Sequence, residues 1–470
     1  MKPRPSPRNR GSVLIVALIL SALISISLVS YYQMAATALK GANRSFLSLS
    51  NVDLAEVGIE RAMAAFYTQS TGVASATAWS GWTLSGTTAT RTFTGFTPSP
   101  NATGVVRVYV NYYTNTGGTP LIVAKSTITP PDGPALSKFV EVTLRSRGLF
   151  GIGMVARSTV RMNSNARSDS WNSDPDNNSA TAAVAYSTGV KRDNGNVGVV
   201  SATNGAITMA SNAEIYGTAN TGGGTVSTSG NVRIYSSTSP SNPKVDPSRI
   251  RRDFSYTFPA ITVPSPTVVN YITSSVTTPR TFPNGSTDQL NTADGKYYFV
   301  FGSGSAINMD SNKNLTINGP VVWVLENHSG VTAIHTSSNA DVIFSGTTST
   351  LELYTNGNIS LDSNNDLNAG GQPNRFLTYG TNPTSQTFTL SSNVNWYGPI
   401  YAPNMSFQID SNCSLFGSVI ANTIQMDSNS VFHYDEQLAN LGGSSGVAVA
   451  KWRELQSATE RAAYASVLNF

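Results

Sequence analysis

The sequence predicts a mainly β protein: a long N-terminal transmembrane and amphipathic α-helix, a small antiparallel β head, and then a parallel β-helix-like solenoid. Three patterns predict this fold class: one uncharged apolar run, three runs that alternate apolar and polar residues, and a short phrase that recurs seven times. The composition agrees, because 39 glycines and 23 prolines favour turns between short strands. Charged residues make up 12%, about half of the roughly 25% typical of soluble domains.

The first element is an uncharged apolar helix. No charged residue occurs from Gly11 to Leu39, and Ser12–Val29 is long enough, at 1.5 Å per residue, to cross a hydrocarbon core of about 30 Å. Four cations precede it: Lys2, Arg4, Arg8 and Arg10. By the positive-inside rule they place the amino terminus in the cytoplasm. We therefore expect a single-pass protein of the cytoplasmic membrane with its C-terminal body outside the cytoplasm.

The helical pattern continues beyond the membrane span. Apolar residues recur at spacings of three and four, as on one face of a helix: Leu39, Ala42, Phe46, Leu49, Val52, Ala55, Ile59, Met63 and Phe66. Span and stripe predict one helix to about Phe66. We expect the stripe to pack partly on the protein's own sheet and partly on neighbouring helices.

This N-terminal region resembles PilX-type pilus assembly proteins, relatives of type IV pilins. The resemblance rests on the basic leader that ends in Gly11, the uncharged segment behind it, and LAEVGIERAMAAF at Leu54–Phe66. It implies that a prepilin peptidase cuts between Gly11 and Ser12 and leaves the apolar segment on the mature protein. Major pilins start with Phe and carry Glu at the fifth mature position, where this chain has Ser12 and Val16. The alternative is a signal anchor that is never processed.

The second element is a small antiparallel sheet. Three alternating runs follow a region rich in Ser, Thr and Gly: Val105–Tyr113, Leu121–Thr129 and Lys138–Arg145. Turns containing Gly and Pro separate them, which is typical of an antiparallel sheet. Such a sheet could cover the apolar stripe of the helix.

The third element is a repeat. An apolar residue, any residue and then Ser-Asn recur at Met162–Asn165, Met209–Asn212, Met309–Asn312, Leu361–Asn364, Leu390–Asn393, Ile409–Asn412 and Met426–Asn429, with weaker copies at Ser229–Asn231 and Ser338–Asn339. Imperfect short periods indicate a solenoid, in which stacked coils bury one continuous core. We expect each Asn to occupy a left-handed turn position and to bond to the backbone or to the Asn of the next coil.

Residues 145–455 also resemble the C-terminal region of PilX-like proteins. The shared words include SDSWNSD at Ser168–Asp174, NWYGPIYAPN at Asn395–Asn404 and KWREL at Lys451–Leu455. They imply a parallel β-helix-like body. Eight prolines between Pro240 and Pro283 predict an extended segment that runs along this body.

These patterns divide the chain into seven segments. They are a prepilin-type leader (1–11), the transmembrane and amphipathic helix (12–67), a pilin-like β region (68–147), a first solenoid segment (148–237), a Pro-rich insertion (238–290), a second solenoid segment (291–435) and a C-terminal cap (436–470). The charged residues His433–Glu436 close the last coil and are interpreted as covering the solenoid end.

Candidate chemistry is sparse. Four acidic residues precede Ser-Asn in the repeat: Asp310, Asp362, Asp410 and Asp427. Because they recur with the repeat, we interpret them as turn residues; a cation column or a catalytic cleft are the alternatives. The single Cys413 allows no disulfide and is interpreted as a buried filler. The aromatic residues Trp79, Trp82, Trp396, Tyr397 and Tyr401 are interpreted as packing, with a ligand-binding platform as the alternative.

The sequence therefore favours a structural protein rather than an enzyme. Residues 12–470 carry 26 basic and 26 acidic side chains, so no basic stripe for nucleic acid is expected, and no cofactor is expected. We expect a component of a type IV pilus or related secretion fibre that acts in assembly, priming or tip display. The expected partners are the prepilin peptidase, other pilins or pseudopilins, the membrane, and a surface glycan or protein ligand. The alternative is a membrane-tethered β-helix enzyme that acts on surface polysaccharide.

Overall fold

The computed structural model describes residues 10–70, 73–115, 119–131, 133–176, 178, 181–236, 244–441 and 444–469. They form two compact units. The head contains residues up to 69, residues 73–145 and residues from 448 onward, and the solenoid contains residues 146–447. The expected fold class is confirmed: one long apolar helix, one antiparallel sheet, and parallel sheets in solenoid order.

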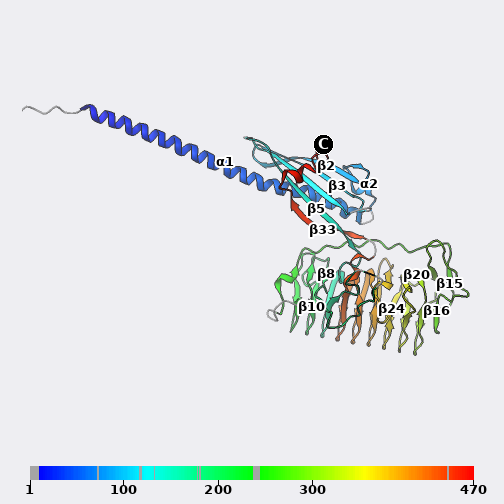
Figure 1. The fold of residues 1–470 in the computed structure, drawn as a ribbon. Coiled ribbons are helices and arrows are strands. Elements are labelled where there is room, and N and C mark those ends of the chain that lie inside the picture. Colours follow the sequence, from blue (N-terminus) through cyan, green and yellow to red (C-terminus); the bar gives the residue numbers. More distant parts are fainter. Residues whose placement is uncertain are drawn as a thin grey trace, which may run out of the picture. The chain divides into compact units, whose positions relative to one another are not determined.

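The helix α1 runs without a break from Arg10 to Ser70, four residues beyond the predicted end (Figure 1). The segment contains no proline, which would remove a helical hydrogen bond. Some of its hydroxyls bond back to the preceding turn: Ser25 Oγ donates to the Ser21 carbonyl at 2.8 Å, and Thr37 Oγ1 to the Gln33 carbonyl at 2.8 Å. These side chains thereby satisfy their hydrogen-bonding groups within the helix.

The head sheet has six strands in the order β1-β2-β3-β4-β5-β33. The predicted runs form its centre, and β3, β4 and β5 pair antiparallel as expected. The strands are β1 (Thr83–Ser85), β2 (Thr88–Ser99), β3 (Ala102–Asn111), β4 (Leu121–Thr129), β5 (Leu136–Gly148) and β33 (Ser444–Glu454). Two short helices complete the head: α2 (Ser75–Ala78) and α3 (Ala458–Ala462). Residues 444–454 of the expected cap thus belong to the head sheet.

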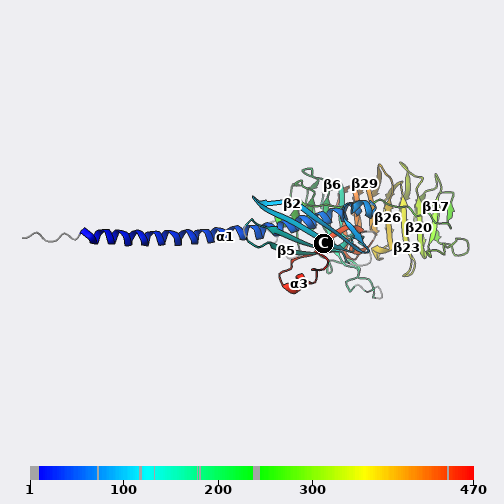
Figure 2. The ribbon, with the colours of Figure 1, turned by 90° about the horizontal axis from the view of Figure 1, so that it is seen from above.

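The second half of α1 packs against this sheet, and Figure 2 shows β2 and β5 lying along it. Gly58 is the point of closest approach: a Cβ there would lie 2.6 Å from Val106 Cγ1 and 2.7 Å from Val108 Cγ2. Asn51 is fully buried, and its Nδ2 donates to the Leu136 carbonyl at 2.8 Å. The helix is therefore held by close backbone approach and by hydrogen bonds as well as by apolar contact.

The predicted stripe is only partly correct. Ala55, Ile59 and Phe66 are buried, but Leu39, Phe46 and Leu49 are exposed. The buried face consists instead of Leu47, Asn51, Leu54, Ala55, Gly58, Ile59, Ala62, Ala65 and Phe66. Small residues and one Asn lie on this face because the helix approaches the sheet closely, and an apolar pattern does not detect them.

One face of the solenoid is a parallel sheet of ten strands. Neighbours far apart in sequence, such as β32 and β7, pair within it. In spatial order the strands are β13 (Arg233–Tyr235), β10 (Glu214–Tyr216), β7 (Arg167–Trp171), β32 (Val431–Asp435), β30 (Ser414–Gly417), β28 (Asn395–Tyr397), β25 (Asp366–Leu367), β22 (Val342–Phe344), β19 (Leu315–Ile317) and β16 (Arg280–Phe282).

The remaining solenoid strands form a second parallel sheet of seventeen strands, which covers the other sides of the coils. They are β6 (Met154–Met162), β8 (Val197–Val199), β9 (Ile207–Met209), β11 (Ala219–Thr221), β12 (Val226–Thr228), β14 (Ile250–Arg251), β15 (Asn270–Ile272), β17 (Tyr297–Phe301), β18 (Ile307–Met309), β20 (Pro320–Leu325), β21 (Thr332–Thr336), β23 (Thr350–Thr355), β24 (Asn358–Leu361), β26 (Phe376–Gly380), β27 (Gln386–Leu390), β29 (Ile400–Ile409) and β31 (Val419–Met426).

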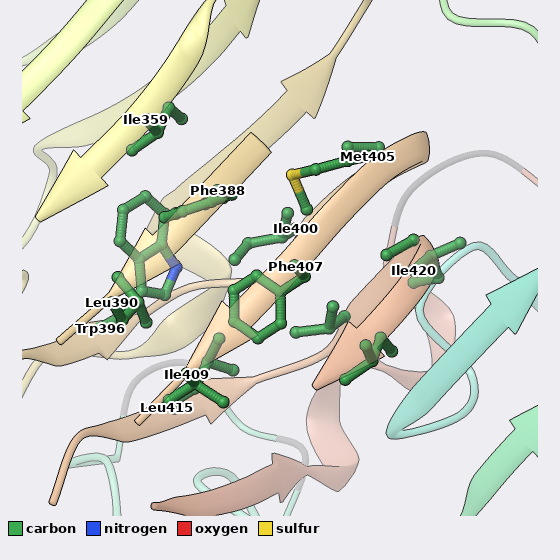
Figure 3. Close-up of a cluster of buried hydrophobic side chains, with 14 of the residues drawn as sticks. Ile359, Phe388, Leu390, Trp396, Ile400, Met405, Phe407, Ile409, Leu415 and Ile420 are labelled. Atoms are coloured by element: carbon green, nitrogen blue, oxygen red, sulfur yellow. The ribbon is translucent and has the colours of Figure 1, made fainter. Parts of the chain in front are cut away.

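Inward side chains from both sheets fill one continuous core. Figure 3 shows part of it, where Phe388, Trp396 and Phe407 point into the interior of neighbouring coils. The Phe388 ring lies 4.9 Å from the Trp396 ring and 5.5 Å from the Phe407 ring, both edge-on. Alternating strands present their apolar side chains to this core because side chains on a strand point to opposite faces in turn.

The Ser-Asn phrase forms the corner between the two sheets. Both residues of each predicted pair have positive φ, for example 54° at Ser411 and 63° at Asn412. In six of the seven copies the Asn backbone N–H bonds to the Ser carbonyl of an adjacent coil, as from Asn412 to Ser428 at 2.9 Å. The side chains form a ladder as well, with Asn429 Nδ2 donating to Asn412 Oδ1 at 3.1 Å. Both expected roles of the Asn are confirmed.

The order of the coils in space differs from their order in the sequence. The coils that follow β6 and β7 are added toward one end of the stack, as far as β14. Residues 252–269 contain no strand; this segment, here called the strap, runs along the stack to β15 (Figure 1). The later coils return until β31 pairs with β6. The strap is anchored along its length: the Tyr256 hydroxyl donates to the Leu149 carbonyl at 2.5 Å, and the Tyr401 hydroxyl to the Pro259 carbonyl at 2.7 Å.

Candidate functional site

The predicted processing bond lies at the start of α1. Gly11 and Ser12 both belong to its first turn, while residues 1–9 of the leader lie outside the described part of the chain. Cleavage between Gly11 and Ser12 stays a prediction.

The first half of α1 is an exposed apolar surface. From Val13 to Met34 every large apolar side chain is more than half exposed. From Val13 onward, α1 is long and apolar enough to cross a membrane. It is a candidate membrane anchor. Exposure of large apolar side chains continues to Phe46 (53%) and Leu49 (71%), beyond the roughly 20 residues that a membrane span requires. This extra apolar surface is available to other helices.

The four repeat aspartates all occupy the corner position directly before Ser-Asn, but they do not form an unbroken column. Backbone bonds place Ser337 between Asp310 and Asp362, and Ser391 between Asp362 and Asp410. Only Asp410 and Asp427 occupy successive coils, where the Asp427 N–H bonds to the Ile409 carbonyl at 3.0 Å.

These carboxylates have local partners. The Lys313 ammonium, 2.9 Å from Asp310, lowers the pKa of that carboxyl. Gln425 Nε2 donates to Asp427 Oδ2 at 2.7 Å. Within the described ranges, no group of three or more His, Cys, Asp or Glu is placed to hold a metal ion.

A buried polar cluster lies where the first and last coils meet. His433 Nδ1 is 2.5 Å from Asp169 Oδ1, and the Tyr186 hydroxyl donates to Asp169 Oδ2 at 2.8 Å. Burial, followed by the charge of Asp169, raises the pKa of Tyr186. Tyr186 also lies against the His433 ring, with the ring centroids 3.7 Å apart. Asp169 and His433 are buried and Tyr186 is half-buried, and their contacts join the first and last coils.

The interpretation of His433–Glu436 as an end cap is wrong. The strand β32 that contains Asp435 lies between β30 and β7, inside the stack. Asp435 is fully buried, burial raises the pKa of its carboxyl, and it accepts hydrogen bonds from the Ser173 backbone N–H at 3.0 Å and from the Ser173 hydroxyl at 2.6 Å. Sequence reasoning missed this role because it requires knowing that residues 167–171 cover the last coil.

The other single residues take the predicted structural roles. Cys413 is buried, and burial raises the pKa of its thiol to about 11, so it is a filler. Trp79, Trp396 and Tyr401 are buried as predicted, while Tyr397 is half-buried and stacked on Phe416 at 4.2 Å. Trp82 is half-buried, and its ring packs edge-on against the Trp79 ring at 5.0 Å, so these five residues pack within the fold and do not form an exposed aromatic platform.

The comparisons with known proteins are limited. A family model described as a domain of unknown function (DUF7305) matches residues 262–441, which lie in the solenoid. The chain is similar to the solved structure of the competence-associated pilin ComZ from Thermus thermophilus, with 12% identity over 77% of this chain and 86% of that chain. The TM-score of 0.21 is too low to show a shared fold. No curated protein matches the chain.

Proposed function

We propose that this chain is a structural, prepilin-like component of a type IV pilus or related secretion fibre. A prepilin peptidase removes the leader at Gly11–Ser12, the first half of α1 is held in the cytoplasmic membrane, and the same surface then packs among the helices of other pilins or pseudopilins. The solenoid is the part that the fibre displays outside the cytoplasm, for priming, tip display or adhesion. This role requires no catalytic residue.

The division of α1 carries the proposal. One unbroken helix packs its second half on its own antiparallel sheet and leaves its first half exposed, uncharged and apolar. A simple tether needs only about 20 apolar residues, whereas two further exposed apolar side chains, Phe46 and Leu49, lie past Lys40 and Arg44 and beyond the reach of a bilayer. A surface that must contact lipid first and other helices later explains that extra length.

The processing step can be tested directly. The full-length chain is produced in cells with and without a prepilin peptidase, and membrane fractions are analysed by mass spectrometry. With the peptidase we expect a chain that begins at Ser12, with or without an N-methyl group. Gly11→Leu should block cleavage, whereas Gly41→Leu, where nothing lies within 4 Å of a new Cβ, should not. Recovery of only full-length protein, or of a chain cut beyond residue 30, would contradict the proposal.

A further inference from the structure

A cavity of about 280 Å³ opens on the outer face of the ten-stranded sheet, where β22 and β25 pair. Its lining combines two carboxylates, an amide, a guanidinium and apolar side chains: Asp341, Asp366, Asn368, Arg375, Ile343 and Phe344. None of these residues belongs to the Ser-Asn corner.

The repeat is interrupted at this point. The strand β25 has only two residues, and Asn368, with φ of 59°, turns the chain out of the sheet. Residues 369–371 and Arg375 then form one wall of the cavity. On the following coils the outward position carries Tyr397 and Phe416, which stack on each other, whereas Ile343 on the preceding coil is 45% exposed. An apolar floor is therefore left open beside the wall.

Each aspartate uses one oxygen for the fold. Asp341 Oδ1 accepts the Asp366 backbone N–H at 2.8 Å, and Asp366 Oδ1 accepts from Asn395 Nδ2 at 2.8 Å. Asn314 does the same one coil earlier, where its Oδ1 accepts the Asp341 N–H at 2.9 Å. An asparagine thus satisfies the structural role, and the second oxygen of each carboxylate receives no hydrogen bond from the described residues.

The charges in the cavity are not paired. Burial, with the charge of Asp366 as a smaller cause, raises the pKa of Asp341. Arg375 is fixed by two backbone carbonyls, with its Nε 2.8 Å from Ser349 O and its Nη2 2.7 Å from Gly346 O. Neither aspartate forms an ion pair with Arg375 or any other cation of the described chain. The cavity therefore offers two free acceptors and a fixed donor beside apolar side chains.

We propose that this cavity binds one saccharide residue of a surface glycan. Sugar hydroxyls donate to the free oxygens of Asp341 and Asp366, another sugar oxygen accepts from Arg375, and the apolar face of the ring lies on Ile343. A few convergent polar groups beside an apolar wall are typical of small-ligand sites, and hydrogen bonds to charged groups are the stronger ones.

Other ligands fit this combination less well. A polycationic peptide would satisfy the two carboxylates but would bring further positive charges near Arg375, and a bare divalent cation would leave the apolar floor unused. An amino sugar adds an ammonium group that suits the two carboxylates, so we expect it to bind more tightly than a neutral sugar. Saccharide binding does not require cleavage between Gly11 and Ser12. Either proposal can therefore fail while the other holds.

The test uses the full-length protein in detergent and three defined probes: hexamers of glucose, N-acetylglucosamine and glucosamine, measured by calorimetry. We expect the glucosamine hexamer to bind most tightly, and Asp341→Asn and Asp366→Asn each to weaken that binding at least tenfold with little change in melting temperature. Asp362→Asn is the matched control. It also removes one negative charge, at the corner of the coil that contains Asp366, and should leave binding unchanged.

Several results would overturn the proposal. One is the absence of binding by all three hexamers; another is binding that survives both cavity variants. Equal binding of hexalysine would identify a peptide site instead. A rise in melting temperature with Ca²⁺ that requires Asp341 and Asp366, without sugar binding, would identify a cation site. Cleavage of a hexamer by the wild-type protein would make the cavity catalytic and would support the enzyme alternative.

Discussion

The head and the solenoid bury their apolar surface in opposite ways. In the head, one helix lies so close to a sheet that Gly58 leaves no room for a side chain. In the solenoid, large side chains such as Trp396 and Phe407 fill an interior that the sheets leave open. The head therefore depends on a single fit between two elements, whereas the solenoid depends on many similar layers, each supported mainly by its neighbours.

Each unit contains a buried carboxylate, Glu141 in the head and Asp435 in the solenoid, and the two have different partners. In the head, Arg453 Nε lies 2.6 Å from Glu141 Oε1, and this ion pair joins β33 to β5. In the solenoid, the buried Asp435 is held by the hydroxyl and the backbone N–H of Ser173 rather than by a cation. The difference gives the units distinct sensitivities to mutation and to pH.

The largest effect on stability is expected from Trp396→Ala. Its ring is buried and lies 4.5 Å from the Phe376 ring. Removing a buried Trp costs about 3–5 kcal/mol, and hydrogen exchange should rise in the adjacent coils while the head keeps its protection. Tyr397→Ala, at the next and half-buried position, should cost less. Equal loss of protection in both units would break the comparison.

A smaller effect is expected from Gly58→Val in the head. The new side chain would meet Val106 and Val108, and overpacking of this kind costs about 1–3 kcal/mol. Hydrogen exchange should rise in the head only. Gly41→Val is the control, because a Cβ there meets nothing within 4 Å. If the two variants have the same melting temperature, the close contact between helix and sheet does not stabilise the head.

Acid should affect the units with opposite sign. Hydrogen bonds from Arg453 lower the pKa of Glu141, so that carboxylate contributes stability that is present above the ordinary glutamate pKa and lost as pH falls through its lower, folded value. Burial raises the pKa of Asp435, so acid removes the cost of its buried charge. From pH 7 toward pH 4, solenoid protection relative to Asp435→Asn should rise. Head protection relative to Glu141→Gln should stay unchanged over most of that range and fall only below the ordinary glutamate pKa of 4.5. The same direction in both pairs would contradict the two assignments.

The smallest effect on stability, with a large effect on assembly, is expected from Phe46→Asp. Phe46 is 53% exposed, whereas its neighbour Leu47 is 1% exposed. Phe46→Asp should leave the melting temperature of the isolated protein unchanged but abolish incorporation into fibres or complexes, measured by co-purification with other pilins. Leu47→Asp should instead unfold the head, because it buries an unpaired charge. Normal assembly of the Phe46→Asp variant would indicate that α1 acts only as a membrane anchor.

The local features of the fold could be predicted from the sequence, and the non-local ones could not. The pairs at Ser164–Asn165 and Ser411–Asn412 appear as a repeat because each turn needs the same two left-handed residues. Even the weak copy at Ser338–Asn339 has this conformation. The pairing of β6 with β31 has no such signal in the sequence, because it depends on where the strap places the later coils.

The sites show the same limit. Asp310 and Asp427 could be assigned to the corner because they follow the repeat, and the structure places both there. The sequence does not single out Asp341 and Asp366, because they follow no repeated phrase and their cavity depends on the early end of β25. A signal was present, however: the loop Asn368–Gly371 interrupts the regular spacing of strands.

The return of the last coil to the first determines when folding can finish. Asn165 and Asn429 are bonded although 264 residues separate them, and pairings this distant in sequence form slowly. While the chain is being made from its amino end, β6 and β7 keep open edges, which are sites for wrong pairing. Only a chain completed through β32 closes those edges, so the last residues of the solenoid to be synthesised are the ones that protect the first.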